Sequence, residues 1–252
     1  MLHLRGSAFL GTLAPIRCGA SHGHEGRSLG RNPEDQPDHR REWKERRHRD
    51  RLEGLVAAAL ELHRRHGESA LLDPERRGSI AMLQTLDREH VQRIAELHAE
   101  FDQRLRPGER ALVVRHRREL AALLDGSACL CIAGGHVGVL LHRLHLFAIP
   151  ELWGGRPLVL WSAGAMAMCE RVVLFHQHQG GGVDTEVMEA GLGVLRGIVP
   201  LPHAKKRLDL HDHTGLQLLA LRMQPDRCIL LDDGCRIDWD GQHWRPRPDT
   251  KE

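Results

Sequence analysis

The sequence predicts an α/β fold, with a mostly parallel sheet flanked by helices and a helical extension or insertion toward the N-terminus. Beyond about residue 110, short apolar runs alternate with helical patterns, which is typical of a parallel sheet. Before that point the apolar spacing is helical and is interrupted by breakers. The 252 residues, 41% of them hydrophobic, suffice for one sizeable core plus an appendage.

Residues 1–50 are predicted to form a flexible N-terminal segment with a first strand near Leu2 to Leu4. Residues 19–40 are rich in Gly, His, Arg and Pro and have no apolar periodicity. The apolar stretch at the start is too short to span a membrane. No acidic residue precedes Glu25, so a signal or transit peptide is an open alternative. The basic tract 40–51 is interleaved with acidic residues, which favours a solvated helix face over a nucleic-acid site.

Two amphipathic helices are expected in the extension, which we assign to residues 51–108. The first covers 52–66 and the second 74–105, and the breakers Gly67 and Pro107-Gly108 follow them. The α/β core is then expected over residues 109–245, with a short tail at 246–252.

Within the core, helices are expected over 112–124 and 137–147. Apolar strands are expected to end near a Gly-Gly pair at 134–135, at Ser162, at His203 and at the acidic pair Asp232-Asp233. In an open parallel sheet, functional residues gather at the carboxyl ends of the strands. The sequence therefore predicts that these four positions contribute to one site.

Ser162 stands where an apolar strand is followed directly by small residues. The run 157–161 has the character of a central strand, and the small residues in 163–167 allow a helix to begin at once and pack closely. A serine at such a junction projects its hydroxyl beside backbone N–H groups that can stabilise an oxyanion. The pattern predicts a nucleophile elbow, although Leu160 stands where G-x-S-x-G has its first glycine. The alternative is that Ser162 only caps the helix.

His203 is the candidate general base for Ser162, because a serine hydroxyl is a poor nucleophile without one. Asp233, or Asp232 as the alternate, would orient the imidazole. The oxyanion hole would be formed by the backbone N–H groups of Ala163 and Gly135. In the alternative interpretation, His203 is a histidine at the end of a strand with no catalytic role, and Asp232 and Asp233 only belong to the turn before Gly234.

The motifs along the chain resemble, in their order, those of the serine peptidase family of dipeptidase E and cyanophycinase. The order is Gly-Gly, then W-S-A-G-A, then G-L-G with G-I-V and P-H, and finally an acidic pair. The resemblance covers roughly residues 110–240. It implies the class I glutamine amidotransferase-like fold, which is flavodoxin-like, and a serine hydrolase that cleaves a peptide or isopeptide-like amide through an acyl-enzyme. Its known members act at aspartyl or aspartate-linked amides. The sequence departs from the family at Leu160 and at His136, where the family usually carries Asn.

Two functions of different classes follow from these observations. The first is the serine hydrolase. The second is a catalytically silent amidotransferase-like module for binding or regulation, since a fold does not fix a function. The elbow carries no cysteine, which argues against glutamine amidotransferase chemistry.

Lys206 and Arg207 follow the candidate base and are predicted to bind a substrate carboxylate, since guanidinium and ammonium groups give charge-assisted contacts. The alternative is that the basic residues at 205–207 are merely solvated. The expected partner is a peptide or other small amide substrate, with no nucleic acid and no membrane. The net charge of +2, from 36 basic and 34 acidic residues, gives no global field for either. A homodimer is left open.

No cofactor and no metal is expected. The sequence holds 19 histidines, and His203, His211, Asp212 and His213 could supply a metal-binding set, but the histidine pairs are scattered along the chain. The six cysteines form no C-x-x-C pair, which indicates a reduced, cytoplasmic setting.

Overall fold

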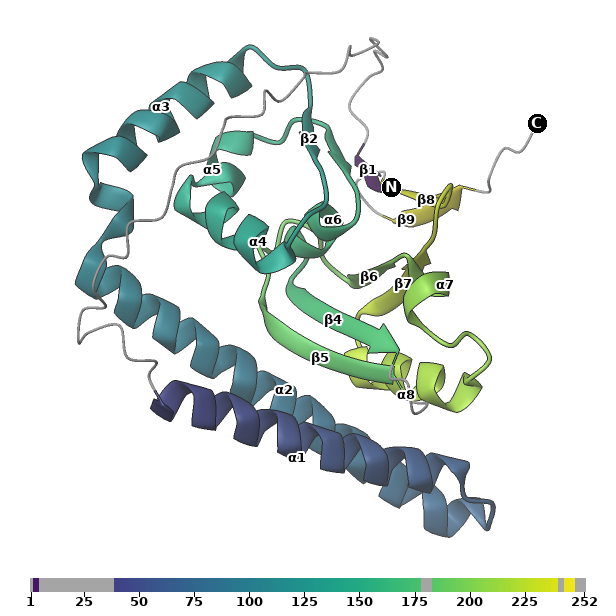
Figure 1. Cartoon of the computed structure of the whole chain (residues 1–252). Helices are drawn as coiled ribbons and strands as arrows, with labels where there is room; N and C mark the ends of the chain where they lie inside the picture. Colours follow the sequence, from purple (N-terminus) through teal and green to yellow (C-terminus); the bar gives the residue numbers. More distant parts are fainter. Residues whose placement is uncertain (1, 5–38, 178–182, 240–242, 248–252) are drawn as a thin grey trace, which may run out of the picture.

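The computed structural model describes residues 2–4, 39–177, 183–239 and 243–247, and it confirms the α/β class (Figure 1). The helices are α1 (His39–Arg64), α2 (Ser69–Leu105), α3 (Ala111–Asp125), α4 (Val137–Leu146), α5 (Ile149–Trp153), α6 (Ala163–Ala167), α7 (Ala204–Arg207) and α8 (His213–Met223), with a 3-10 turn, η2 (Pro107–Glu109). The strands are β1 (Leu2–Leu4), β2 (Leu130–Ile132), β3 (Leu158–Leu160), β4 (Arg171–Gln177), β5 (Val183–Ala190), β6 (Ile198–Pro202), β7 (Arg227–Leu231), β8 (Arg236–Trp239) and β9 (Trp244–Arg247).

The expectation of one mostly parallel sheet holds only in part. The strands form a five-stranded sheet in the order β2-β3-β1-β8-β9 and two pairs, β4-β5 and β6-β7. The pairs β2-β3, β1-β8 and β6-β7 are parallel, whereas β1-β3, β4-β5 and β8-β9 are antiparallel. The first strand causes much of the difference, because it enters between β3 and β8 and runs against β3.

The two ends of the chain differ from the predicted boundaries. The predicted strand at Leu2–Leu4 is present as β1. Helix α1 begins at His39, so residues 39–50 are helical and not part of a flexible segment. The remainder of that predicted segment, 5–38, lies outside the described residues. Strand β9 extends to Arg247 and pairs with β8, so the sheet reaches into the predicted tail.

The antiparallel hairpin β4-β5 has no counterpart in the sequence-based prediction. In β5 the side chains that face inward include Thr185, Val187 and Glu189. Two of these three are polar, so the strand lacks the apolar alternation that identifies a half-buried strand. Because the buried face of β5 is polar, its partners must satisfy hydrogen bonds and charge.

The helical extension packs against the core through a second hydrophobic cluster. Figure 1 shows α1 and α2 side by side, running past β5 and α8. The buried members of the cluster come from α1, α2 and α8: Leu52, Ala59, Leu83, Leu86 and Leu218. The main core fills the space between the strands and α4, α6 and α8.

A buried ion pair lies beside this cluster. Arg222 on α8 is 1% exposed and donates two hydrogen bonds to the carboxylate of Asp87 on α2, at 2.7 and 2.6 Å. Its third nitrogen donates to the carbonyl and hydroxyl oxygens of Thr185 on β5, at 2.9 and 3.2 Å. One guanidinium therefore joins the extension, the hairpin and the C-terminal helix.

Helix α2 is the longest helix in the described part of the chain, and its distal part is open to water. Leu97 and Phe101, which the spacing places on its apolar face, are 40% and 52% exposed. Among the described residues, no helix combines the length and the apolar character needed to cross a bilayer.

Replacing Asp87 by Ala should destabilise the protein strongly, because it leaves the Arg222 guanidinium buried without its counter-charge. We expect a loss of about 3–5 kcal/mol in the free energy of unfolding, measured by urea denaturation. The control is Glu61→Ala, which removes an exposed partner of Arg65 at 3.4 Å and should change stability by less than about 1 kcal/mol. Equal effects of the two substitutions would refute the role given to the buried pair.

Candidate active site

Ser162 has an unusual backbone conformation at the junction of β3 and α6. Its φ is 51° and its ψ is −129°, a combination that L-residues with a side chain rarely adopt. Such a conformation costs roughly 1–3 kcal/mol and persists only where the surroundings enforce it. In the alternative predicted from the sequence, Ser162 would cap α6, but its side chain accepts no capping hydrogen bond. The strained strand-to-helix turn matches the geometry of a nucleophile elbow.

Two glycines allow this turn to approach the end of β2. A Cβ on Gly164 would lie 2.4 Å from the carbonyl oxygen of Ile132, and a Cβ on Gly134 would lie 2.8 Å from the Cβ of Ser162. Neither position has room for a larger residue. Leu160, which replaces the usual elbow glycine, points into the core and is fully buried. The leucine is therefore accommodated on the inner face of β3 and does not crowd the turn.

The two backbone N–H groups predicted to form an oxyanion hole are the amides of Ala163 and Gly135. Ala163 is the first residue of α6, where a helical N–H has no partner within the helix. Gly135 has a φ of 141°, which only glycine adopts readily. Among the described residues neither amide donates to a backbone or side-chain acceptor. His136, next in the chain, accepts a hydrogen bond from the Val139 amide at 3.4 Å and caps α4.

His203 and the acidic pair lie together at the carboxyl ends of β6 and β7. These strands are parallel and in register, and the His203 amide donates to the carbonyl oxygen of Leu231 at 2.8 Å. The Nδ1 atom of His203 is 3.6 Å from a carboxylate oxygen of Asp233. Asp232 accepts a hydrogen bond from the Lys205 amide at 2.9 Å, at the start of α7. Asp233 is thus the acidic residue nearer the imidazole, and Asp232 supports the local backbone.

The structure does not join Ser162 to His203. In the described part of the chain, the Ser162 hydroxyl makes no hydrogen bond, and the His203 ring has only the 3.6 Å contact with Asp233. Helix α6 packs against β6, so the two strand ends belong to neighbouring parts of the fold. The predicted site is therefore present as two halves, one with the serine and the glycines and one with the histidine and the aspartates.

The two basic residues predicted to bind substrate already have partners within the protein. The Lys206 ammonium lies 3.4 Å from a carboxylate oxygen of Asp233, and both side chains are well exposed. The Arg207 guanidinium lies over the ring of Phe175, 5.6 Å from its centre. A substrate carboxylate would have to compete with these contacts, of which the exposed Lys206 pair is the weaker constraint.

The histidine-rich set considered in the sequence does not form a metal site. Asp212 accepts a hydrogen bond from the Gly215 amide at 3.0 Å and caps α8. His203 is directed toward Asp233. Among the described residues, the groups whose ligand atoms converge include neither of these residues, nor His211 or His213.

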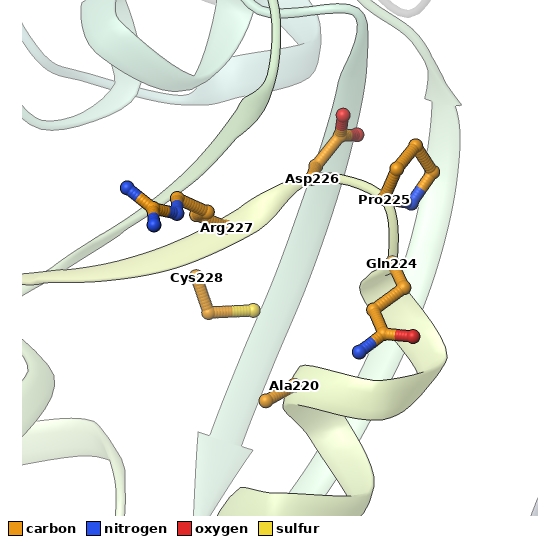
Figure 2. A pocket seen from close by; sticks show the side chains of 6 residues that line it. All are labelled: Ala220, Gln224, Pro225, Asp226, Arg227 and Cys228. Carbon is orange, nitrogen blue, oxygen red and sulfur yellow. The ribbon is translucent and has the colours of Figure 1, made fainter.

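A surface pocket lies away from these residues, at the connection between α8 and β7 (Figure 2). It is lined by Ala220, Gln224, Pro225, Asp226, Arg227 and Cys228. Asp226 is engaged by Arg171 at 2.9 Å, and burial raises the pKa of the Cys228 thiol to about 11. A protonated thiol is a poor nucleophile, so the lining offers no reactive group near neutral pH.

Comparisons with models of protein families, with curated proteins and with solved structures found no match to this chain. The functional argument therefore depends on the sequence motifs and on the geometry of the residues described above.

Replacing Ser162 by Gly should stabilise the protein, because glycine adopts the φ of 51° without steric conflict. We expect the free energy of unfolding to be at least roughly 1 kcal/mol higher in Ser162→Gly than in Ser162→Ala, since alanine retains the strain. Urea denaturation of both variants measures the difference. A less stable glycine variant would contradict the strained turn.

Proposed function

We propose that this protein is a serine hydrolase that cleaves an amide bond through an acyl-enzyme formed on Ser162. The observation that carries the proposal is the backbone of Ser162, a strained non-glycine residue at a strand-to-helix turn. Strained backbone conformations cluster at active sites, where the surrounding structure enforces them. The two unpaired amides of Ala163 and Gly135 add the donors that an acyl-transfer reaction needs.

In the proposed reaction the Ser162 Oγ attacks the amide carbonyl carbon while His203 removes the hydroxyl proton. Negative charge develops on the carbonyl oxygen, which the Ala163 and Gly135 N–H groups stabilise. The imidazolium then gives its proton to the leaving nitrogen, and the C–N bond breaks to leave an ester on Ser162. Water, deprotonated by His203, hydrolyses the ester and restores the serine.

The position of Asp233 suits this role for His203. Because Asp233 faces Nδ1, it favours a proton on that nitrogen, and the lone pair of Nε2 is then available to accept the serine proton. His203 is half-buried at the end of β6 and its ring is not held by a short hydrogen bond. In the proposed mechanism α7 moves toward α6 when substrate binds, and His203 then reaches the Ser162 hydroxyl.

The dipeptidase E and cyanophycinase type, with its class I glutamine amidotransferase-like fold, is the specific form of hydrolase that we propose. Support comes from the order of the motifs along the chain and from their placement after β2, β3, β6 and β7, the strands to which they were assigned. In each of the parallel pairs β2-β3 and β6-β7 the motif residues follow the carboxyl ends of both strands, although the two pairs belong to separate sheets.

The second candidate is a catalytically silent module of the same fold, acting in binding or regulation. The specific observation in its favour is that no contact in the described part of the chain links the Ser162 hydroxyl to His203. Labelling with a mechanism-based probe distinguishes the two candidates.

A fluorophosphonate probe should label the wild-type protein at Ser162, because the probe phosphonylates serines that are activated by a base and an oxyanion hole. Labelling should disappear in Ser162→Ala and persist in the control Ser127→Ala, whose hydroxyl donates to a helix carbonyl at 2.7 Å. In His203→Ala the labelling rate should fall by about 10²–10⁴-fold. An unlabelled wild type would favour the silent module, and undiminished labelling of Ser162→Ala would exclude this serine.

Arg207→Ala should lower kcat/KM selectively for acidic dipeptides, if Arg207 releases the Phe175 ring to contact a substrate carboxylate. We expect a loss of roughly 10-fold on an aspartyl dipeptide and a smaller one on its neutral analogue, with a reduced difference at high salt. Arg227→Ala, at the opposite end of the parallel pair β6-β7, is the matched control. Equal losses on both substrates would exclude the specificity role.

A further inference from the structure

Three side chains from separate parts of the sequence converge on one point away from Ser162. They are His98 on α2, His142 on α4 and Glu189 on β5, and their ligand atoms all lie within 4.8 Å of one another. The Oε2 atom of Glu189 is 3.4 Å from the Nε2 atom of His142 and 3.6 Å from the Nε2 atom of His98. Two imidazoles therefore present the same nitrogen to one carboxylate.

These contacts are long for hydrogen bonds. A charge-assisted N–H···O bond to a carboxylate is about 2.7–2.9 Å long. The same protein contains an ordinary pair of this kind, since His116 Nδ1 is 2.7 Å from an oxygen of Glu119. The contacts around Glu189 exceed that value by more than half an ångström, so direct bonding between the side chains does not account for their arrangement.

The spacing instead suits three ligands of one metal ion. Tetrahedral zinc has donor atoms about 2.0–2.2 Å from the ion, which places neighbouring donors roughly 3.3 Å apart and the centres of two bound imidazole rings roughly 5 Å apart. The observed separations of the two histidine nitrogens from the Oε2 atom of Glu189 are 3.4 and 3.6 Å. The rings of His98 and His142 are 5.1 Å apart between centres, with planes inclined at 80°.

The burial of Glu189 is a second, independent observation. Its side chain is only 8% exposed, whereas those of His98 and His142 are 44% and 56% exposed. A buried carboxylate needs a compensating charge. Among the described residues, the side chains of His98 and His142 contact this carboxylate, and neither approaches closely enough for a strong hydrogen bond. A cation held among the three groups would supply the charge.

A second group, whose members lie on α1, α2 and β5, lacks this geometry. His48, His90 and Glu186 also have ligand atoms close together. However, the two imidazole rings are stacked 3.9 Å apart and nearly parallel, at 16°, so their faces meet and not their nitrogens. The Nε2 atom of His90 is moreover 3.1 Å from the Met188 carbonyl oxygen. Ring stacking and the His90 contact therefore hold the two imidazoles, while the buried Nε2 atom of His48 has no hydrogen-bond partner among the described residues.

We propose that His98, His142 and Glu189 form a binding site for a zinc-type divalent ion that ties α2 to the α/β core. Imidazole and carboxylate ligands suit zinc, and the half-exposed histidines leave the fourth position to water. The ion would join the helical extension, α4 and the hairpin at one point. The proposal does not depend on hydrolase activity, and the site lies apart from the candidate nucleophile.

Zinc titration of the full chain tests this site. After dialysis against a chelator and then metal-free buffer, the wild type should bind one equivalent of zinc tightly in a calorimetric titration. The double variant His98→Ala/His142→Ala should bind it at least ~100-fold more weakly, since it loses two ligands directly. Glu189→Gln, which keeps the shape of the side chain, should also weaken binding. Zinc should raise the midpoint of thermal unfolding of the wild type and not that of the double variant.

The matched control is His116→Ala/His211→Ala, which removes two histidines outside the proposed site. Circular dichroism verifies that each variant is folded, and the half-exposed positions of His98 and His142 make this the expected result. The proposal is supported if the control keeps the tight equivalent and the double variant loses it. It is overturned if the wild type binds no tight equivalent, or if the double variant binds zinc as tightly as the wild type.

Discussion

The buried guanidinium of Arg222 is the interaction on which the arrangement of the parts depends. Its four hydrogen bonds are divided equally between Asp87 on α2 and Thr185 on β5, so a single side chain of α8 orients two other elements. Desolvating a charge is expensive, and the geometry must be kept accurately to compensate for it. This requirement favours one docking position of the helical extension on the core. Apolar contacts alone would distinguish poorly between that position and one in which α2 is shifted by a helical turn.

The hairpin β4-β5 connects the helical extension to the turn at Ser162. Three residues of β5 connect to α2. Thr185 accepts a hydrogen bond from Arg222 of α8, which also binds Asp87 on α2. Further along β5, Met188 contacts His90 and Glu189 contacts His98. Strand β4 begins only a few residues after α6, and the Leu192 amide, just beyond β5, donates to the Ala167 carbonyl oxygen at 2.9 Å. Helix α6, which follows Ser162, is thus hydrogen-bonded to the segment after β5, and the helical extension packs against β5. In this arrangement the extension is part of the support of the candidate site.

The sequence predicted those helices and strands whose apolar residues recur with one clear period. The other features depend on contacts between residues far apart in the chain. The strand-to-helix turn at Ser162 could be predicted because strand, serine and small residues are adjacent in the chain, and the ends of β6 and β7 because each follows an apolar run. The hairpin was missed because the inward face of β5 carries Thr185 and Glu189. The convergence of His98, His142 and Glu189 had no local pattern at all, since three separate elements supply one ligand each. The distance from Ser162 to His203 likewise depends on how α6 packs, which spacing along the chain does not specify.

The position of β1 in the middle of the five-stranded sheet affects the order in which the strands pair during folding. Residues 2–4 pair with β3 on one side and with β8, near the other end of the chain, on the second side. Loop closure over so long a separation is slow. During synthesis β1 exists long before its neighbour β8 has been made, and a strand edge without its neighbour is prone to wrong pairing. The assembly of this sheet is therefore a late step, and a cell that makes the protein must keep the growing chain from associating with others until residues 236–239 have emerged.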